Sequence, residues 1–427
     1  MIMKIFIITL GTRGDVQPYV ALGKGLKTAG HDVTVCASSS FEPFITEHGL
    51  QYGYMNDELV RFIHSAEGRY AIENMTNLIN SLKHIRKMLK QVEPIQWMAL
   101  RDSWNSAQQA HPDLIIYHPK ATGAPHFAEK LGIPAILALP LPIHVPTSEF
   151  PCFVFPHWKL GGWYNKLTHN LLLKISTKGM GKFINVWRKE QNLPPQPKGI
   201  YLLHSQASVH HPVLFAFSKF VVPVPADWQG KAEVTGYWFL DGQDAWQPPV
   251  ALQDFLNAGA PPVYVGFGSM AGRNPERITR IVVEALQQAK VRGVLASGWG
   301  GLAASDLPDT IHTIDDAPHE WLFPRMVAVV HHGGSGTTAA GLRAGRPTII
   351  CPFIADQPFW GRRVEVPGVG PAPIPRKKLT TENLAAAIRE VTSNPIYQKN
   401  AEALGEKIRS EDGVTNAVTF IERIIHG

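Results

Sequence analysis

The stretch from Val327 to Trp360 reads VAVVHHGGSGTTAAGLRAGRPTIICPFIADQPFW. Its first residues form an apolar run of strand length, which leads into the polar, glycine-rich sequence HHGGSGTT at residues 331–338. Residues 339–344 have helical character, and the apolar run at residues 348–352 predicts a second strand. The pattern therefore places a polar turn between a buried strand and the N-terminus of a helix.

A turn of this kind is suited to binding an anion. The first backbone N–H groups of a helix have no partner within the helix, and the helix dipole places partial positive charge at the same end. Glycines let a ligand approach the backbone closely. The sequence favours a diphosphate held by His332, Gly334, Ser335, Gly336, Thr337 and Thr338. The alternative is a plain tight turn, which many α/β proteins use for structure alone.

A second polar feature, the pair Asp356-Gln357, follows the next predicted strand. Ligands of open α/β sheets bind at the carboxyl ends of the strands. A carboxylate beside an amide suits the hydroxyl groups of a sugar, because the pair supplies both acceptors and donors. We therefore expect Asp356 and Gln357 to hold a sugar next to the diphosphate.

These residues resemble a known family. Pro318-His319, the HHGGSGT turn, Gly345-Arg346-Pro347 and Asp356-Gln357 are similar to the nucleotide-sugar signature of GT-B glycosyltransferases, in the branch of sterol and glycopeptide-antibiotic glycosyltransferases. The resemblance implies an α/β protein of two Rossmann-like domains, with parallel sheets that face a central cleft. It also implies that backbone groups around Pro318 and His319 hold the nucleobase. Plant members stack the base on a tryptophan, and this chain has Asp316 there.

The N-terminal part begins as a parallel α/β sheet, with an apolar strand at residues 4–10, a helix, and a strand at residues 32–37. The GxGxxG dinucleotide fingerprint is absent from this turn. Asp15 lies at the end of the first strand, where it is a helix cap, a salt-bridge partner of Arg13, or a general base that deprotonates an acceptor hydroxyl. The resemblance supports the base, because the sequence GDVQP at residues 14–18 places aspartate where plant members have histidine in Gly-His-x-x-Pro.

The acceptor is expected to bind to this N-terminal part. His118 ends a predicted strand. Residues 56–110 predict a helical stretch whose apolar stripe faces mainly the core or, in part, lines an apolar acceptor cleft. The stripe consists of Leu78, Leu82, Ile85, Met88, Leu89 and Val92. Residues 140–164 are rich in proline and aromatic side chains and predict a long loop, which either covers a binding site or packs on itself. The sequence GGWYNKLTH at residues 161–169 resembles a segment of fungal and plant sterol glucosyltransferases. The candidate acceptor contacts are His118, Phe153 and Trp163.

The composition changes near residue 240, where proline, glycine, aspartate and tryptophan accumulate. We therefore expect an acceptor-binding domain at residues 1–239 and a nucleotide-sugar-binding domain at residues 240–405. A strand early in the second domain leads into Ser269, which is another candidate phosphate contact. In this fold the final helix, about residues 401–425, usually crosses back, so residues 406–427 are expected to join the first domain.

The composition is that of a globular protein. Of 427 residues, 44% are hydrophobic and 18% are charged, which suits two domains. The net charge of +6 comes without a basic, aromatic-interleaved stripe, which argues against nucleic acid and leaves peripheral contact with an anionic membrane open. Three widely spaced cysteines without a CxxC pair argue against a zinc site or a disulfide framework. Because neither a signal peptide nor a run of 18 apolar residues is found, we expect a cytoplasmic protein.

Together these features predict an inverting glycosyltransferase that moves a hexose, first of all glucose from UDP-glucose, to a hydrophobic alcohol such as a sterol or triterpenoid. Asp15 is the expected base. No cofactor is expected, and no metal, because the helix dipole with His332 can replace a cation. Polyketide, carotenoid, lipid and antibiotic acceptors, TDP-sugars and the oligomeric state stay open. Two other classes are a GT-B nucleotide-sugar epimerase and a non-catalytic nucleotide-sugar binder.

Overall fold

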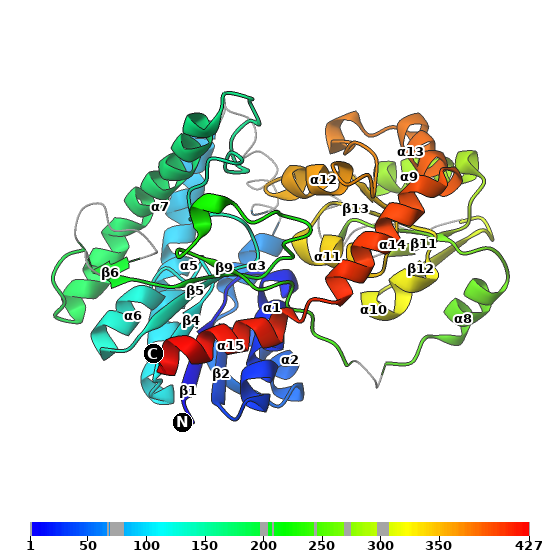
Figure 1. The fold of residues 1–427 in the computed structure, drawn as a ribbon. Coiled ribbons are helices and arrows are strands. Elements are labelled where there is room, and N and C mark those ends of the chain that lie inside the picture. The colour runs from blue at the N-terminus through cyan, green and yellow to red at the C-terminus, as the bar shows by residue number, and fades with distance from the viewer. Residues whose placement is uncertain are drawn as a thin grey trace. The chain divides into compact units, whose positions relative to one another are not determined.

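In the computed structural model the chain forms two compact units, each with its own parallel sheet (Figure 1). Unit 1 comprises Met1–Leu240 together with Asp412–Gly427, and unit 2 comprises Asp241–Glu411. The structure describes residues 2–65, 68, 81–196, 204–206, 209–242, 246–268, 275–296 and 307–426.

The sheet of unit 1 has seven parallel strands in the order β3-β2-β1-β4-β5-β8-β9. They are β1 (Lys4–Ile8), β2 (Asp32–Ser38), β3 (Gln51–Met55), β4 (Leu114–Tyr117), β5 (Ala135–Leu139), β8 (Val213–Phe215) and β9 (Glu233–Val234). A separate antiparallel pair joins β6 (His204–Gln206) to β7 (Val209–His210). The order makes β4 the neighbour of β1, although many residues separate the two strands in sequence.

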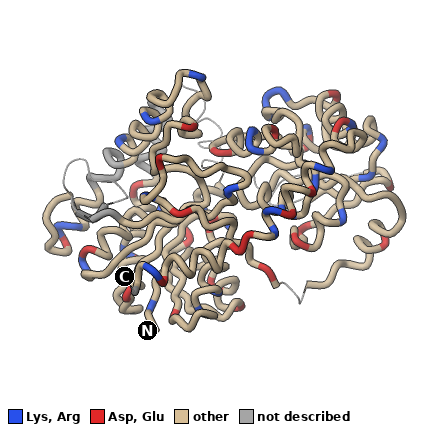
Figure 2. The backbone as a smooth tube through the Cα atoms, in the orientation of Figure 1, with Lys and Arg blue, Asp and Glu red and all other residues tan. Residues whose placement is uncertain are grey.

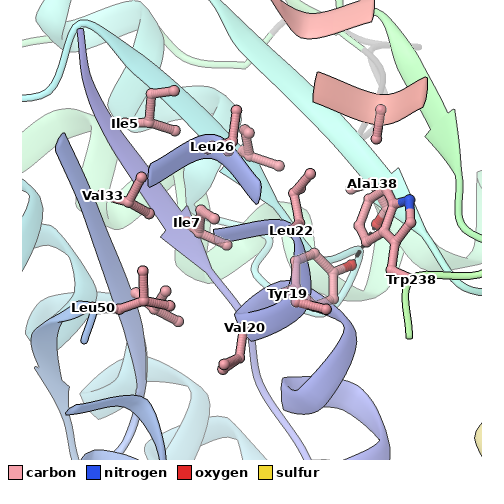
Figure 3. Packing of buried hydrophobic residues seen from close by; sticks show 14 of the residues in the cluster. Ile5, Ile7, Tyr19, Val20, Leu22, Leu26, Val33, Leu50, Ala138 and Trp238 are labelled. Carbon is pink, nitrogen blue, oxygen red and sulfur yellow. Dashed lines mark hydrogen bonds between the residues drawn. The ribbon is translucent and has the colours of Figure 1, made fainter. Parts of the chain in front are cut away.

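Helices cover both faces of this sheet, which explains why its central strands are apolar throughout. On one face, α1 (Arg13–Thr28), α2 (Glu42–Glu47) and α15 (Gly413–His426) pack on the strands. Figure 3 shows this core around α1, where the Tyr19 hydroxyl donates to the Ala138 carbonyl at 2.6 Å. On the other face lie α5 (Ser81–Ala110) and α6 (Ala124–Leu131), joined by the rings of Trp104 and Phe127.

The predicted final helix is two helices. α14 (Pro395–Arg409) belongs to unit 2, while α15 belongs to unit 1 and lies along α1. The break occurs where the Asp412 side chain accepts a hydrogen bond from the Thr415 N–H at 3.0 Å, which starts a new helix. Asn416 then donates to the Thr235 carbonyl at 2.9 Å, which fixes α15 to the end of unit 1. Residues 406–411 therefore lie with unit 2, not with the helix that returns.

The sheet of unit 2 has five parallel strands in the order β12-β11-β10-β13-β14. They are β10 (Val263–Gly266), β11 (Gly293–Ala296), β12 (Ile311–Ile314), β13 (Ala328–His331) and β14 (Thr348–Ile350). One core lies under α9 (Pro275–Ala289) and α13 (Thr381–Ser393). The other lies under α8 (Val250–Asn257), α10 (His319–Leu322) and α11 (Ser335–Arg343).

The apolar run at residues 220–224 predicts a strand by its sequence. It begins in a turn instead, because the N–H groups of Val221 and Val222 both donate to the Ser218 carbonyl. Helices α3 (Glu58–His64) and α5 account for the described part of the predicted helical stretch. The stripe side chains of Leu78, Leu82, Ile85, Met88 and Leu89 lie outside what the structure describes.

The predicted long loop runs to Gly161, and α7 (Gly162–Glu190) follows it. All three cysteines are buried and unpaired. In the described parts of the chain no helix is both long and apolar enough to cross a membrane.

Candidate functional site

In unit 2 the polar turn after β13 is partly helical. Helix α11 begins at Ser335, earlier than its sequence predicts, so that residues 335–338 form its first turn. Its N-cap is Gly334, which has no side chain to satisfy the first N–H groups of the helix. The Thr338 hydroxyl donates a hydrogen bond to the Gly334 carbonyl at 2.9 Å, so it is engaged within the helix. The N-terminus of α11 therefore offers backbone N–H groups that can bind an anion, as the sequence suggested.

His332 lies between two glycines. A Cβ on Gly334 would be 2.6 Å from Nε2 of His332, and one on Gly268 would be 3.6 Å from its Cε1. The turn that follows β10 thus meets the turn that follows β13 at this imidazole. Ser269, the other predicted phosphate contact, lies just outside the described residues.

The His332 ring is held neutral and incompletely bonded. Burial, together with the nearby His319, lowers its pKa to about 4. Among the described residues its Nδ1 atom is buried without a hydrogen-bond partner. A bound ligand is one explanation for such an atom. Twelve buried side-chain atoms of the described residues are in this state, so the atom supports a ligand only together with the adjoining helix N-terminus. The preceding His331 is bonded through one nitrogen, since its Nδ1 accepts from the Gly333 N–H at 3.0 Å, while its Nε2 is likewise buried without a partner among the described residues.

Asp356 and Gln357 adjoin this turn. A Cβ on Gly333, whose φ is +91°, would lie 3.2 Å from the Gln357 carbonyl oxygen. Asp356 is the N-cap of α12 (Gln357–Glu365), and its Oδ2 accepts from the buried Trp360 indole N–H at 2.8 Å. The Gln357 Oε1 accepts from the N–H groups of Phe353 and Ile354, at 2.7 and 3.0 Å. The amide oxygen of Gln357 is therefore bonded within its own loop, and the NH₂ group can donate to a ligand.

Pro318 and His319 lie at the end of β12, where Pro318 is the N-cap of α10. The His319 ring stacks on Phe323 with centroids 4.3 Å apart. Trp321 packs against Trp246 at 5.1 Å and under the Arg325 guanidinium at 4.1 Å. These contacts hold Trp321 within unit 2.

In unit 1, Asp15 is both a helix cap and the centre of a charged cluster. Thr12 is the N-cap of α1, and its N–H donates to Asp15 Oδ2 at 2.9 Å. The other oxygen, Oδ1, lies 2.7 Å from Lys120 Nζ and 3.4 Å from His118 Nε2. The ion-pair partner is thus Lys120, not the Arg13 that the sequence suggested as an alternative.

The surroundings hold the Asp15 carboxylate ionised and oriented. Burial alone raises its pKa, but Lys120, His118 and the Thr12 hydrogen bond outweigh burial, so that the pKa lies below its ordinary value. The Lys120 N–H donates to His118 Nδ1 at 3.1 Å, which places the ring proton on Nε2, facing Asp15. Burial lowers the pKa of His118 to about 3. A Cβ on Gly11 would fall 2.1 Å from Asp15 Oδ2, so this position has room only for glycine.

The GGWYNKLTH segment anchors the aromatic loop. Asn165 Nδ2 donates to the Ser148 carbonyl at 2.7 Å, and Thr168 Oγ1 accepts from the Cys152 N–H at 2.9 Å. Asp227 accepts from the Ser148 N–H at 2.8 Å from the other side. Phe153 is half-buried in this loop, while Trp163 is 66% exposed on the first turn of α7.

The structure therefore brings the predicted residues together in two groups. Unit 2 unites His332, the α11 turn and Asp356-Gln357, and unit 1 unites Asp15 with His118. The sequence analysis did not identify Lys120, which reaches Asp15 only because β4 pairs with β1. Within the described residues there is no cluster of three or more His, Cys, Asp or Glu side chains that could hold a metal ion.

Two family models match this chain. The glycosyltransferase family 28 N-terminal domain matches residues 5–146, which include Asp15, His118 and Lys120. The C-terminal domain of erythromycin biosynthesis protein CIII-like proteins matches residues 299–423, which include His332 and Asp356. Each group of candidate residues thus falls in one matched region.

Similar proteins extend over nearly the whole chain. A sterol 3-beta-glucosyltransferase of Saccharomyces cerevisiae is 38% identical over 98% of this chain and 35% of its own length. The sterol 3-beta-glucosyltransferases UGT80A2 and UGT80B1 of Arabidopsis thaliana are 37% and 35% identical, over 97% and 99% of this chain and 64% and 68% of their own lengths. The chain thus spans about a third of the yeast protein and about two thirds of the plant proteins.

Solved structures share the fold. The glycotransferase of kitacinnamycin superposes with a TM-score of 0.73 at 20% identity, over 99% of this chain and 98% of that one. Glycosyltransferase VinC, in complex with DTDP, superposes with a TM-score of 0.64 at 20% identity, over 99% of both chains. These likenesses confirm the predicted GT-B class, with two parallel α/β sheets.

Proposed function

The chain belongs to the GT-B UDP-glycosyltransferase family, in its sterol 3-beta-glucosyltransferase branch, and on this premise we propose that it transfers glucose from UDP-glucose to a sterol hydroxyl. The observation that carries the proposal is the identity of 35 to 38% with sterol 3-beta-glucosyltransferases over 97 to 99% of this chain. The two groups of polar residues fit the two chemical tasks of that reaction, as follows.

The donor is held by unit 2. The backbone N–H groups at the start of α11 and the unpartnered Nδ1 of His332 bind the diphosphate. These groups are fixed before the reaction, so they stabilise the charge that gathers on the leaving diphosphate without reorganising. Ser269, which lies outside the described residues, stays a predicted further phosphate contact. Pro318 and His319, at the end of β12, border the nucleobase.

The sugar is held beside the diphosphate by Asp356 and the NH₂ group of Gln357. The diphosphate turn and Asp356-Gln357 adjoin each other, so the sugar and its leaving group are positioned by one rigid strand-end region. No resident cofactor takes part in this scheme. We propose transfer without a metal ion, which turnover after chelation with EDTA will check.

Asp15 is the base of unit 1. The acceptor oxygen attacks the anomeric carbon, the bond from that carbon to the diphosphate oxygen breaks with its electron pair leaving on UDP, and the acceptor proton goes to Asp15. A single displacement inverts the anomeric centre, so that an α-linked donor gives a β-glycoside. Lys120 and His118 act as positioning residues, because they hold Oδ1 from the side that faces away from Thr12.

The acceptor is proposed to be large and apolar. His118, Phe153 and Trp163 are the candidate contacts, and the anchored loop that carries Phe153 supplies a fixed apolar surface. Burial of apolar surface contributes about 25 cal/mol per Å² before the costs of association. A sterol gains far more from such burial than a small phenol does. Because sterols reside in membranes, we also propose a peripheral membrane contact.

The proposal is tested by competition. A sterol and a small phenolic alcohol are offered together with UDP-glucose, and the glucosides are compared by mass spectrometry. Sterol glucoside is expected to dominate, and Phe153→Ala or Trp163→Ala is expected to raise the KM for the sterol more than that for UDP-glucose. Preference for the phenol would overturn the sterol acceptor and point to a polyketide or antibiotic aglycone, whereas epimerised UDP-sugar without any glucoside would overturn the transferase.

A further inference from the structure

Exposed apolar side chains gather on one region of unit 1. Of the sixteen large hydrophobic side chains that are exposed in the described residues, seven lie between Val154 and Ile175. Three of them, Val154, Trp158 and Leu160, belong to the aromatic loop, and they are 51%, 59% and 48% exposed. The other four continue onto α7, which follows the loop directly.

The four residues on α7 form a stripe. Trp163, Leu167, Leu171 and Ile175 recur every four residues and are 66%, 51%, 41% and 58% exposed. Side chains four positions apart lie on the same side of a helix, one above the other. A surface helix ordinarily places polar side chains on its outward face. The inward face of α7 is also apolar, with Leu173, Ile184 and Trp187 buried. The core therefore has its own apolar side chains from this helix, and the outward stripe adds nothing to it.

The net positive charge of the protein comes from the loop and helix that carry these apolar side chains. Residues 150–189 contain seven Lys or Arg side chains and neither Asp nor Glu. The whole chain has 41 basic and 35 acidic residues, so the rest of the chain has 34 basic against 35 acidic, a net charge of −1. Figure 2 shows basic positions along α7.

Not all of these cations are available to a partner. Arg188 is buried in an ion pair with Glu129 at 2.6 Å, and Lys166 lies 3.3 Å from Asp227. Lys159, Lys174 and Lys189 are exposed. The acidic groups closest in sequence are Glu149, which is exposed, and Glu190, which pairs with Arg101 at 3.2 Å.

We propose that the stripe on α7 and the exposed loop residues before it form a docking surface for an anionic phospholipid membrane. An apolar stripe flanked by lysines is the pattern of a helix that lies in the membrane interface, and each lysine near an anionic surface adds attraction. Symmetric pairing with a second copy would bring this face against itself and so oppose cations to cations. The role of docking in sterol capture rests on the proposed function, whereas membrane binding itself does not.

Vesicle sedimentation of the full chain tests the surface. The vesicles contain phosphatidylcholine with or without phosphatidylserine, and no sterol, so that binding does not run through the acceptor site. Wild type should bind the anionic vesicles better, and the variant Leu167→Gln/Leu171→Gln/Ile175→Gln should lose roughly tenfold or more of its partitioning, because three aliphatic side chains no longer enter the bilayer. Lys159→Glu/Lys174→Glu should abolish the preference for anionic lipid.

Matched controls use equally exposed side chains elsewhere. Val250, Val366 and Ile396 are 72%, 79% and 56% exposed in unit 2, and Lys377 and Lys399 are exposed there as well. The triple change of these hydrophobic residues to glutamine, and the double change of these lysines to glutamate, should leave vesicle binding as in wild type. Wild-type partitioning of the stripe variant, or an equal loss in the controls, would overturn the proposal. So would a stripe variant whose only change is a shift from dimer to monomer in sedimentation velocity.

Activity separates this proposal from the proposed function. With sterol in detergent the stripe variant should match wild type, and with sterol embedded in vesicles it should lose most of its turnover. If wild type makes no sterol glucoside even in detergent, the proposed function fails while the vesicle result still stands. If the stripe variant keeps full turnover on vesicle-embedded sterol, docking plays no part in acceptor capture and that part of the proposal is wrong.

Discussion

Lys120 Nζ lies 2.7 Å from Oδ1 of Asp15, and the Thr12 N–H lies 2.9 Å from Oδ2, so that each oxygen of this carboxylate has a fixed donor. A carboxylate held in this way keeps its charge and its direction. Its basicity is low, because the ammonium group stabilises the ionised form. The arrangement favours precise aim of the carboxylate over high basicity.

The first prediction concerns Asp15 itself. Asp15→Asn preserves an oxygen for Thr12 but removes the proton acceptor, so turnover should fall by roughly two to four orders of magnitude. Affinity for UDP, measured by calorimetry, should not change. Turnover within about threefold of wild type would remove Asp15 from the role of base.

The second prediction concerns Lys120. Since Lys120 lowers the pKa of Asp15, Lys120→Met should raise that pKa, and the acidic limb of the profile of kcat/KM against pH should move to higher pH. Lys120→Arg keeps the charge and serves as the matched control. The acidic limb of its kcat/KM profile should lie close to that of wild type. A lower rate in Lys120→Met with an unmoved limb would show that Lys120 only supports the local fold.

The third prediction concerns the diphosphate. His332→Ala should weaken binding of UDP and of UDP-glucose by about 1.5–3 kcal/mol, the range for hydrogen bonds to charged groups. The control is His312→Ala, because His312 stacks on Phe255 in the same unit, on β12, and takes no part in the turn. Isothermal titration calorimetry reads both. Equal UDP affinity in His332→Ala and His312→Ala would place His332 outside the site.

The fourth prediction uses two variants of Asp356. Asp356→Ala leaves the buried Trp360 N–H unpaired, which should cost about 1–3 kcal/mol of stability as well as activity. Asp356→Asn retains an oxygen for Trp360, so its thermal stability should be close to that of wild type, while glucosyl transfer falls and UDP affinity holds. If Asp356→Asn were fully active, the side chain would be structural only.

The fifth prediction concerns acid. Burial lowers the pKa of His118 and His126 to about 3 and that of His144 and His169 to about 4, all in unit 1. Below an ordinary histidine pKa of about 6.5, the unfolded chain binds protons that the folded chain refuses, so stability should fall as pH drops from 6.5 toward 4. Each histidine contributes up to about 1.4 kcal/mol per pH unit. A melting temperature that stays level from pH 6.5 to pH 5 would contradict this account.

The parts that the sequence predicted correctly rest on strong local patterns. Buried strands at both β1 and β13, and the polar turns that follow them, could be found because apolar runs end in glycine-rich segments. The contact of Lys120 with Asp15 could not, because 105 residues separate them and only the position of β4 beside β1 joins them. The early start of α11 was missed because Gly, Ser and Thr have low helix propensity, and the helix end is stabilised by its tertiary setting instead.

The site details that were missed have a similar cause. The Gln357 oxygen accepts from two N–H groups of its own loop. This contact depends on the backbone conformation of the loop, which the residue types alone do not predict. The break between α14 and α15 lies where Asp412 begins a new helix. It was missed because the sequences on both sides of the break have helical spacing of apolar residues.

Because unit 1 is completed by Asp412–Gly427, the ribosome delivers all of unit 2 before unit 1 has its last helix. Ala417, Val418 and Ile421 enter the core beside α1, so that face stays uncovered until α15 has been synthesised. Unit 2 can fold as it emerges, in the manner of an inserted domain, while unit 1 waits for its closing segment. A premature stop near residue 412 would therefore damage unit 1, which carries Asp15, although the lost residues follow unit 2 in the sequence.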